Sequence, residues 1–289
     1  MSDPRDAVLA LLDLDGVATA VEQARDACTR LRWHEALRRR TAEAAAESRI
    51  RGARASAALD GAELPLDVVR DRVRGVRPWS DPIDPVDQVV RGAVHASLET
   101  ENLRHLVLHA PAQALARLHV AATSGLLAAD QVGRPRVGQE RSGELVDLGE
   151  APAPPFVPAR LAGVAELLRA AGSLPVPVVA ALAHAEIAVT RPFVRGNGLV
   201  ARALERTVVV GAGLDPTGVA VPEAGYLAAG GPAYLGALVA YASGTPAGVA
   251  LWLRHAGAAL VTGAQEGERI CDAVLAGRLS TIVTSVEGT

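Results

Sequence analysis

Two apolar runs joined by a short turn set the strongest constraint on the fold of this chain. The first run covers residues 176–189 and the second covers residues 199–210, and both read as apolar helices. Pro192 ends the first helix, because proline lacks an N–H donor and clashes with the preceding turn. The Gly-Asn-Gly triplet at 196–198 allows a tight turn with an accessible backbone. The sequence therefore predicts two packed helices connected by a sharp turn.

The start of the second helix has the properties of an anion site. Its first backbone N–H groups have no helical partner, and the helix dipole adds a partial positive charge. Arginines at 191, 195 and 202 add three fixed charges. We predict a phosphate-binding set made of Arg195, Gly196, Asn197, Gly198 and Arg202. The alternative is an ordinary turn between helices with arginines at the helix ends.

Composition favours helices throughout the chain. Aromatic residues make up 3% of the 289 residues and hydrophobic residues 49%, so the core has to be built from Ala, Val and Leu. Alanine and leucine are strong helix formers, whereas sheets favour aromatic and β-branched side chains. We therefore expect an all-α fold, with enough chain for one large domain or two modest ones.

Charge and cysteine content exclude several classes of function. The chain has no lysine, so its 29 basic residues are all arginine. Arginine keeps its proton near neutral pH and forms no Schiff base, which excludes a Walker-type phosphate lysine and pyridoxal chemistry. The net charge of −3 predicts no nucleic-acid partner. Cys28 and Cys271 are too few for a disulfide framework or a cysteine zinc site.

The longest apolar stretch is expected to be buried and not to cross a membrane. Residues 224–253 contain no charged side chain, but glycines and prolines divide them into two short helices. The first 16 residues carry acids within their apolar run and show no cleavage-like segment, so we expect no signal peptide. We expect a cytoplasmic protein, and the bias toward arginine and alanine favours an actinobacterial source.

Helical spacing extends over most of the chain. The expected helices are 17–59 as one long element, 88–127 as two helices meeting near Pro111, 160–171, 234–241, 249–262 and one more after Gln265. Four histidines lie between residues 88 and 127. Two of them, His105 and His109, have the i,i+4 spacing that can hold a metal, but no acid lies between them. We interpret all four as structural and expect no metal site.

One segment does not read as helix. Residues 137–148 have Ser142 and Gly143 in their middle and predict a short β-hairpin, which a proline-rich segment follows as far as residue 159. A plain surface loop is the alternative.

Residues 181–202 read ALAHAEIAVTRPFVRGNGLVAR and resemble the signature of the Fic (Fido) family. That signature is His-Pro-Phe, any residue, Asp or Glu, Gly-Asn-Gly-Arg, two residues, Arg. It is matched at Pro192, Phe193, Gly196, Asn197, Gly198 and Arg202. Arg191 replaces the catalytic histidine, Arg195 the metal-binding acid and Leu199 the first arginine. The resemblance implies a Fic-type helical bundle with one β-hairpin flap and a degenerate active site.

A second point of resemblance lies in residues 55–69. Many Fic proteins carry an inhibitory helix that ends in Ser or Thr, three residues, Glu, then Gly or Asn. Ser56, Asp60 and Gly61 fit this pattern, with Asp in place of Glu. The spacing places Ser56 and Asp60 on one helix face, and Gly61 suits a helix end. The resemblance implies that Asp60 pairs with Arg202, and an ordinary helix end is the alternative.

The resemblance also implies how the chain is organised. It divides the chain into an N-terminal helical region at 1–80 that contains the inhibitory helix, a Fic-like core at 81–275 and a tail at 276–289. The proline-rich residues 77–87 form the boundary. Residues 137–148 correspond in position to the flap with which family members clamp a target peptide by strand addition. A protein target at this flap and a homodimer are the implied partners.

The resemblance implies a reaction that the departures from the signature disfavour. An intact Fic site transfers AMP from ATP to a target hydroxyl, with the histidine as base, the acid on Mg²⁺ and the arginines on the phosphates. Arg191 cannot accept a proton near neutral pH, and Arg195 repels a divalent cation. We therefore assign no catalytic residue and expect a non-catalytic regulatory protein that binds ATP, another nucleotide or another phosphate ligand, with a doubtful role for Mg²⁺.

Two alternatives stay open at this point. One is an AMP transferase or other phosphate-group transferase that works by altered chemistry, with His184 as its base. The other is a helical scaffold for protein partners in which the pocket is vestigial.

Overall fold

The computed structural model describes residues 4–144, 146 and 148–279, and within these residues it contains only helices and loops. The predicted all-α fold is therefore confirmed. The helices are α1 (Pro4–Leu9), α2 (Val17–Arg32), α3 (Thr41–Leu59), α4 (Leu66–Val73), α5 (Pro85–Leu103), α6 (Leu106–His109), α7 (Pro111–Thr123), α8 (Val157–Arg169), α9 (Val176–Thr190), α10 (Asn197–Gly211), α11 (Pro222–Ala229), α12 (Gly231–Ala242) and α13 (Pro246–Leu275).

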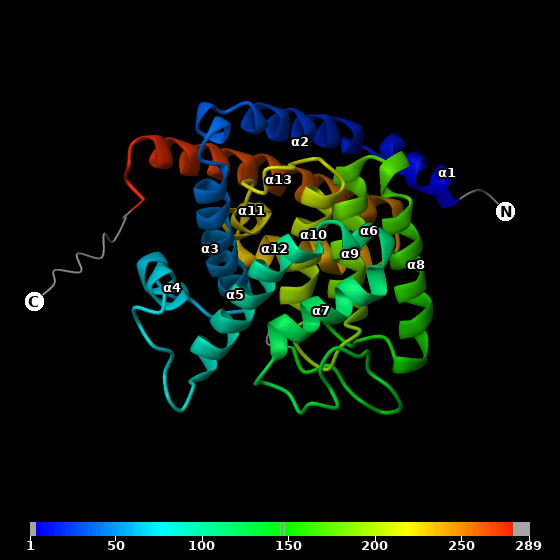
Figure 1. The fold of residues 1–289 in the computed structure, drawn as a ribbon. Helices are drawn as coiled ribbons and strands as arrows, with labels where there is room; N and C mark the ends of the chain where they lie inside the picture. The colour runs from blue at the N-terminus through cyan, green and yellow to red at the C-terminus, as the bar shows by residue number, and fades with distance from the viewer. Residues whose placement is uncertain (1–3, 145, 147, 280–289) are drawn as a thin grey trace, which may run out of the picture.

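The predicted pair of apolar helices forms the centre of the molecule. α9 and α10 pack against each other, and α5, α7, α8, α12 and α13 surround them (Figure 1). α9 is apolar on nearly all sides and is buried on nearly all sides, as expected for a helix without a polar face. The turn between the two helices is thereby fixed inside the bundle.

The N-terminal helices differ from the prediction of one element over residues 17–59. α2 ends at Arg32, a short 3₁₀ turn (Glu35–Arg38) follows, and α3 begins at Thr41. His34 has an extended backbone, and its Nδ1 accepts a hydrogen bond from the Ala36 N–H at 3.3 Å, which stabilises the break. The break lets α2 lie along α13 while α3 packs on α5, α11 and α13 (Figure 1). Periodicity alone missed it, because each half keeps helical spacing.

At the other end of the chain, the two predicted helices at 249–262 and after Gln265 are one continuous helix, α13. Thr245 caps its start by accepting a hydrogen bond from the Gly248 N–H at 3.1 Å. The glycines within it do not end the helix, because neighbouring backbone packs onto them: a Cβ on Gly267 would lie 2.9 Å from the carbonyl oxygen of Val219. The helix therefore runs along α2, α11 and α12 without a break.

The β-hairpin predicted for residues 137–148 is wrong for the described residues of that segment, and residues 145 and 147 lie outside them. Within the segment the Glu140 N–H donates to the Val137 carbonyl at 3.1 Å in a single local turn, and the other backbone bonds go to the turn after α9. The Gly143 N–H donates to the Val194 carbonyl at 2.8 Å, and the Arg136 N–H donates to the Pro192 carbonyl at 2.7 Å. The segment therefore lies against the turn in irregular conformation.

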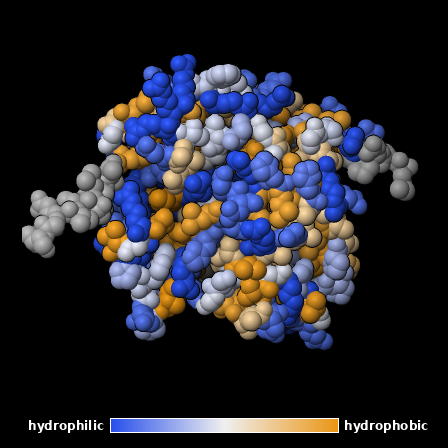
Figure 2. All heavy atoms as spheres, viewed as in Figure 1, coloured by the Kyte–Doolittle hydropathy of each residue, from blue (hydrophilic) through white to orange (hydrophobic). Residues whose placement is uncertain are grey.

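The surface mixes polar and apolar residues. On the face shown in Figure 2, hydrophilic and hydrophobic residues alternate across the whole molecule. No helix in the described part of the chain combines the length and the apolar character needed to cross a bilayer.

The close contact between α11 and α13 gives a test of the packing. A Cβ on Gly225 would lie 2.1 Å from the Ala259 carbonyl oxygen, so Gly225→Ala has to push the two helices apart. We expect a loss of about 1–3 kcal/mol in the free energy of unfolding, measured by urea denaturation. The matched control is Gly236→Ala on α12, where a Cβ meets nothing within 4 Å. That variant should gain about 0.5–1 kcal/mol, because alanine replaces glycine inside a helix. Equal effects in the two variants would contradict the described contact.

Candidate functional site

The turn between α9 and α10 is held in one conformation by its own side chains. α9 ends at Thr190, and the backbone of the next residue, Arg191, is left-handed at φ 47° and ψ 62°. The buried Asn197 then closes the turn, because its Oδ1 accepts from the Phe193 N–H at 2.8 Å and its Nδ2 donates to the Phe193 carbonyl at 2.9 Å. The predicted sharp turn is therefore formed, and asparagine supplies both of its closing hydrogen bonds.

His119 supports the same turn from α7. Its ring stacks on Phe193 with centroids 3.9 Å apart, its Nδ1 accepts from the Gly133 N–H at 2.8 Å, and its Nε2 donates to the Arg195 carbonyl at 3.1 Å. Burial lowers the pKa of His119 to about 4. The neutral ring therefore acts as a structural residue, as the sequence predicted.

The end of α3 lies on α10 through Arg202. This guanidinium is 1% exposed. Nη2 donates to Asp60 Oδ1 at 2.7 Å, and Nε donates to Ser56 Oγ at 2.7 Å. Nη1 donates to Tyr234 Oη at 3.3 Å. Gly61, at φ +83°, follows directly after the end of α3. The structure thus brings together Ser56, Asp60, Gly61 and Arg202, with the pairing that the resemblance implied.

Glu144 is a site residue that the sequence analysis missed. Its carboxylate accepts a hydrogen bond from the Asn197 N–H at 3.2 Å, another from Asn197 Nδ2, and a third from the Ser142 hydroxyl at 3.3 Å. An internal carboxylate therefore lies at the start of α10, where free N–H groups and the helix dipole attract an anion. Burial raises the pKa of Glu144 above its ordinary value. No local signal marks this residue, since its role depends on how residues 142–144 fold back onto α10.

The two acids nearly fill the space at the start of α10. Asp60, Glu144, Arg191, Arg202 and Gly198 line a cavity of about 10 Å³, which has room for about one water molecule. Asp60 also lies close to the helix start, because a Cβ on Gly198 would meet its Oδ1 at 2.9 Å. The predicted phosphate site is thus occupied by carboxylates of the chain itself.

The three departures from the signature lie in different surroundings. Arg191 is buried, and its Nη1 donates to the Gly149 carbonyl at 2.8 Å. Arg195 is half-buried and is absent from the described lining of the small cavity. Leu199 is buried, with its side chain next to Gly92 on α5. The structure therefore gathers Gly196, Asn197, Gly198 and Arg202 at the helix start and leaves Arg195 beside it.

A second residue without a sequence signal, Arg136, fixes the end of α9. The guanidinium is 3% exposed. Its Nε donates to the Arg191 carbonyl at 2.7 Å, and its Nη2 donates to the carbonyls of Thr190 at 3.3 Å and Pro152 at 3.0 Å. A cation on the last carbonyls of a helix satisfies their lone pairs and complements the negative end of the dipole.

His184 lies in the core of the bundle. It is fully buried, its Nδ1 is 2.6 Å from Glu205 Oε2, and its Nε2 is 2.8 Å from Tyr234 Oη. Burial holds the pKa of His184 well below its ordinary value and that of Glu205 well above it. Burial therefore favours the neutral form of each group. His184 does not line the cavity at α10.

The fold is that of Fic proteins. A Fic family protein from Desulfovibrio desulfuricans G20 superposes with a TM-score of 0.68 at 22% identity, over 93% of this chain and 77% of that one. A Fic domain containing signaling protein from Bacteroides thetaiotaomicron VPI-5482 gives 0.62 at 14% identity, over 88% and 98%. Fic-1 (residues 134–508) from C. elegans gives 0.61 at 18%, over 91% and 73%. No protein-family model and no curated protein matches the chain.

The buried ring of His119 predicts a loss of stability in mild acid. Its pKa is about 4 in the folded chain and 6.5 in the unfolded one. Below pH 6.5 the unfolded chain binds a proton that the folded chain refuses, so this group's contribution falls as the pH drops from 6.5 toward 4. The full loss is about 3 kcal/mol. We expect His119→Asn to be less stable at pH 7 and to flatten the pH dependence of urea unfolding between pH 7 and pH 4.5. His109→Asn, at an exposed ring, is the control and should keep the wild-type slope.

Proposed function

We propose that this chain is a Fic-family protein that has lost AMP transfer and acts as a regulatory protein that binds a nucleotide or another phosphate-bearing ligand. The observation that carries the proposal is the place of Asp60 and Glu144. Asp60 accepts a hydrogen bond from the Arg202 guanidinium, and Glu144 accepts one from the Asn197 N–H. These two donors are the groups that a phosphate would use. The ligand and the two acids therefore compete for one set of donors.

The loss of AMP transfer follows from the groups around the cavity. Arg191, at the position of the family's base, is a guanidinium that donates to a carbonyl and cannot accept a proton. Arg195, at the position of the family's metal-binding acid, is a cation, so the site does not fit Mg²⁺ at that position. Phosphate charge would instead be neutralised by arginine, which makes ATP without Mg²⁺ the favoured form of the ligand.

The binding of a ligand requires Glu144 to move away from the start of α10. The Asp60 carboxylate is fixed by α3, whereas Glu144 lies in the segment that contacts the turn through Gly143. We propose that a protein partner on residues 137–148, where the apolar side chain of Val137 is 58% exposed, shifts Glu144 away from α10. The chain would then report the presence of a partner by opening its phosphate site.

A second candidate function is a protein-interaction scaffold with a vestigial pocket. The observation that favours it is the cavity volume of about 10 Å³, which is too small for a nucleotide while Asp60 and Glu144 occupy the site. The altered-chemistry enzyme receives less support, because both ring nitrogens of His184 have partners in the core.

Calorimetric titration with ATP tests the lead proposal. We expect weak or no binding by the wild type, tighter binding by Asp60→Ala and by Glu144→Ala, and a gain of at least about 100-fold in the double variant, since each truncation removes one competing carboxylate. Mg²⁺ should weaken this binding. Asp26→Ala, at an exposed acid on α2, is the matched control and should behave as wild type.

The control for folding and the contradicting outcome are both measurable. Asp60→Ala leaves Arg202 buried without its carboxylate and should destabilise the chain by about 3–5 kcal/mol, whereas Glu144→Ala keeps that pair. If a folded Glu144→Ala variant and the double variant both give no heat with ATP, the binding proposal is wrong and the scaffold takes its place.

Incubation with ATP labelled at the α-phosphate tests the loss of transfer. We expect no label on the chain or on added candidate proteins, because the base position holds Arg191. Label that appears with wild type and disappears with His184→Ala would instead support the transferase with altered chemistry. Glu186→Gln, two residues away on α9, controls for general damage to that helix.

A further inference from the structure

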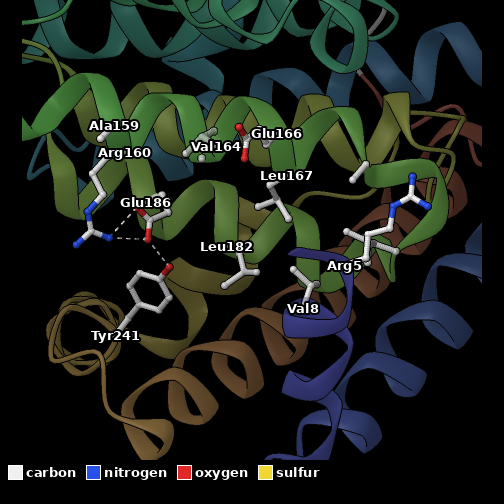
Figure 3. Close-up of a pocket in the computed structure, with 13 residues that line it drawn as sticks. Arg5, Val8, Ala159, Arg160, Val164, Glu166, Leu167, Leu182, Glu186 and Tyr241 are labelled. Carbon is white, nitrogen blue, oxygen red and sulfur yellow. Dashed lines mark hydrogen bonds and ion pairs between the residues drawn. The ribbon is translucent and has the colours of Figure 1, made fainter. Parts of the chain in front are cut away.

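A second cavity lies apart from the start of α10, between α1, α8, α9 and α12 (Figure 3). Its volume is about 380 Å³, within the range of about 300–1,000 Å³ that is usual for small-molecule sites. The described residues that line it share no member with the cavity at Asp60 and Glu144. It is therefore an independent candidate for a ligand.

Most side chains in the middle of this cavity are apolar, and the exposed Glu166 on α8 also lines it (Figure 3). Val8 from α1, Leu167 from α8 and Leu182 from α9 face the same space (Figure 3). Gly163 on α8 also lines it, and a Cβ built there would meet nothing within 4 Å. The shape and lining suit an apolar body that excludes water from these side chains.

One end of the cavity carries a carboxylate. Glu186 is the only acidic residue of α9, where His184 is the other ionisable side chain, and the Glu186 side chain is 19% exposed. Tyr241 donates its hydroxyl proton to Glu186 Oε1 at 2.6 Å. This acid interrupts a helix that is otherwise buried and apolar, which makes it the polar anchor of the cavity.

The cation now on Glu186 is weakly placed. Arg160 approaches both carboxylate oxygens with one nitrogen, Nη1, at 3.3 Å, and its side chain is 55% exposed. A strong guanidinium–carboxylate pair uses two nitrogens at shorter distances. Exposed pairs of this kind contribute little and exchange readily with solvent or other ions. Arg5, the other cation at this cavity, lies at the opposite end from Glu186 (Figure 3).

We propose that this cavity binds a small primary amine with an apolar body. The ammonium replaces Arg160 on Glu186, and the Tyr241 oxygen accepts a further hydrogen bond from it. The apolar body lies over Leu182, Val8 and Leu167. A carboxylate ligand would instead place its charge beside Glu186, so the sign of the charge on the ligand is the specific content of the proposal.

The test compares three probes of equal length, n-hexylamine, hexanoate and hexanol, by calorimetric titration of the full chain at pH 7. We expect hexylamine to bind and hexanoate not to bind. Glu186→Gln should weaken hexylamine at least about tenfold, whereas Arg160→Gln should tighten it about two- to fivefold, because it removes the competing cation. Gly163→Leu should abolish binding by filling the apolar part.

The controls separate binding at this cavity from other effects. Glu22→Gln removes an exposed acid on α2 and should leave the affinity unchanged. Gly163→Leu should not lower the unfolding temperature, since its side chain enters open space and leucine is a better helix former than glycine. The proposal is wrong if hexylamine does not bind, or if its binding survives both Glu186→Gln and Gly163→Leu. It is also wrong if hexanoate is preferred and the effects of Glu186→Gln and Arg160→Gln on affinity are the opposite of those expected.

Discussion

The ion pair between Arg202 and Asp60 is the interaction on which the arrangement of the site depends. Both side chains are nearly inaccessible to water, so neither charge can be solvated if the other is lost. The same guanidinium also holds Ser56 and Tyr234, which come from α3 and α12. One cation in α10 thereby fixes the position of α3 over the turn, and the contents of the small cavity follow from that position.

The second carboxylate at this place comes from a different part of the chain. Asp60 lies at the end of α3, while Glu144 belongs to the irregular segment after α7, and both reach the first turn of α10. Two negative charges so close together oppose each other, and Asp60 contributes to the raised pKa of Glu144. They stay because Arg202 pairs with Asp60, while Asn197 at the start of α10 donates hydrogen bonds to Glu144. The arrangement of Asp60 and Glu144 at the start of α10 is thus a balance between their attraction to positive groups there and their repulsion of each other.

The sequence predicted those features that short-range chemistry determines. The helices α9 and α10 follow from two apolar runs, the turn follows from Pro192 and the Gly-Asn-Gly triplet, and the approach of Asp60 to Arg202 follows from the resemblance and the helical spacing of Ser56 and Asp60. In each case the decisive residues lie within a few positions of one another or within a motif.

Features that depend on distant contacts were missed or predicted wrongly. The expected hairpin at 137–148 bonds to the turn after α9, a partner that no local pattern reveals. Nothing in the local sequence distinguishes Arg136 and Glu144 from surface charges. The fold places Arg136 at the end of α9 and Glu144 at the start of α10. Conversely, the two helices expected at 249–262 and after Gln265 are one helix, and close neighbours pack against the glycines of α13. Tertiary packing decided each of these points.

The length of α13 has a consequence for the whole molecule. Because this helix borders α2 and α3 as well as α9, α11 and α12, residues from Val17 to Val274 share one hydrophobic cluster. Removal of α2 and α3 would expose the apolar side chains of α13 that they cover, and not a polar surface. Point substitutions at the end of α3 are therefore easier for this fold to accept than the loss or replacement of α2 and α3 as a unit.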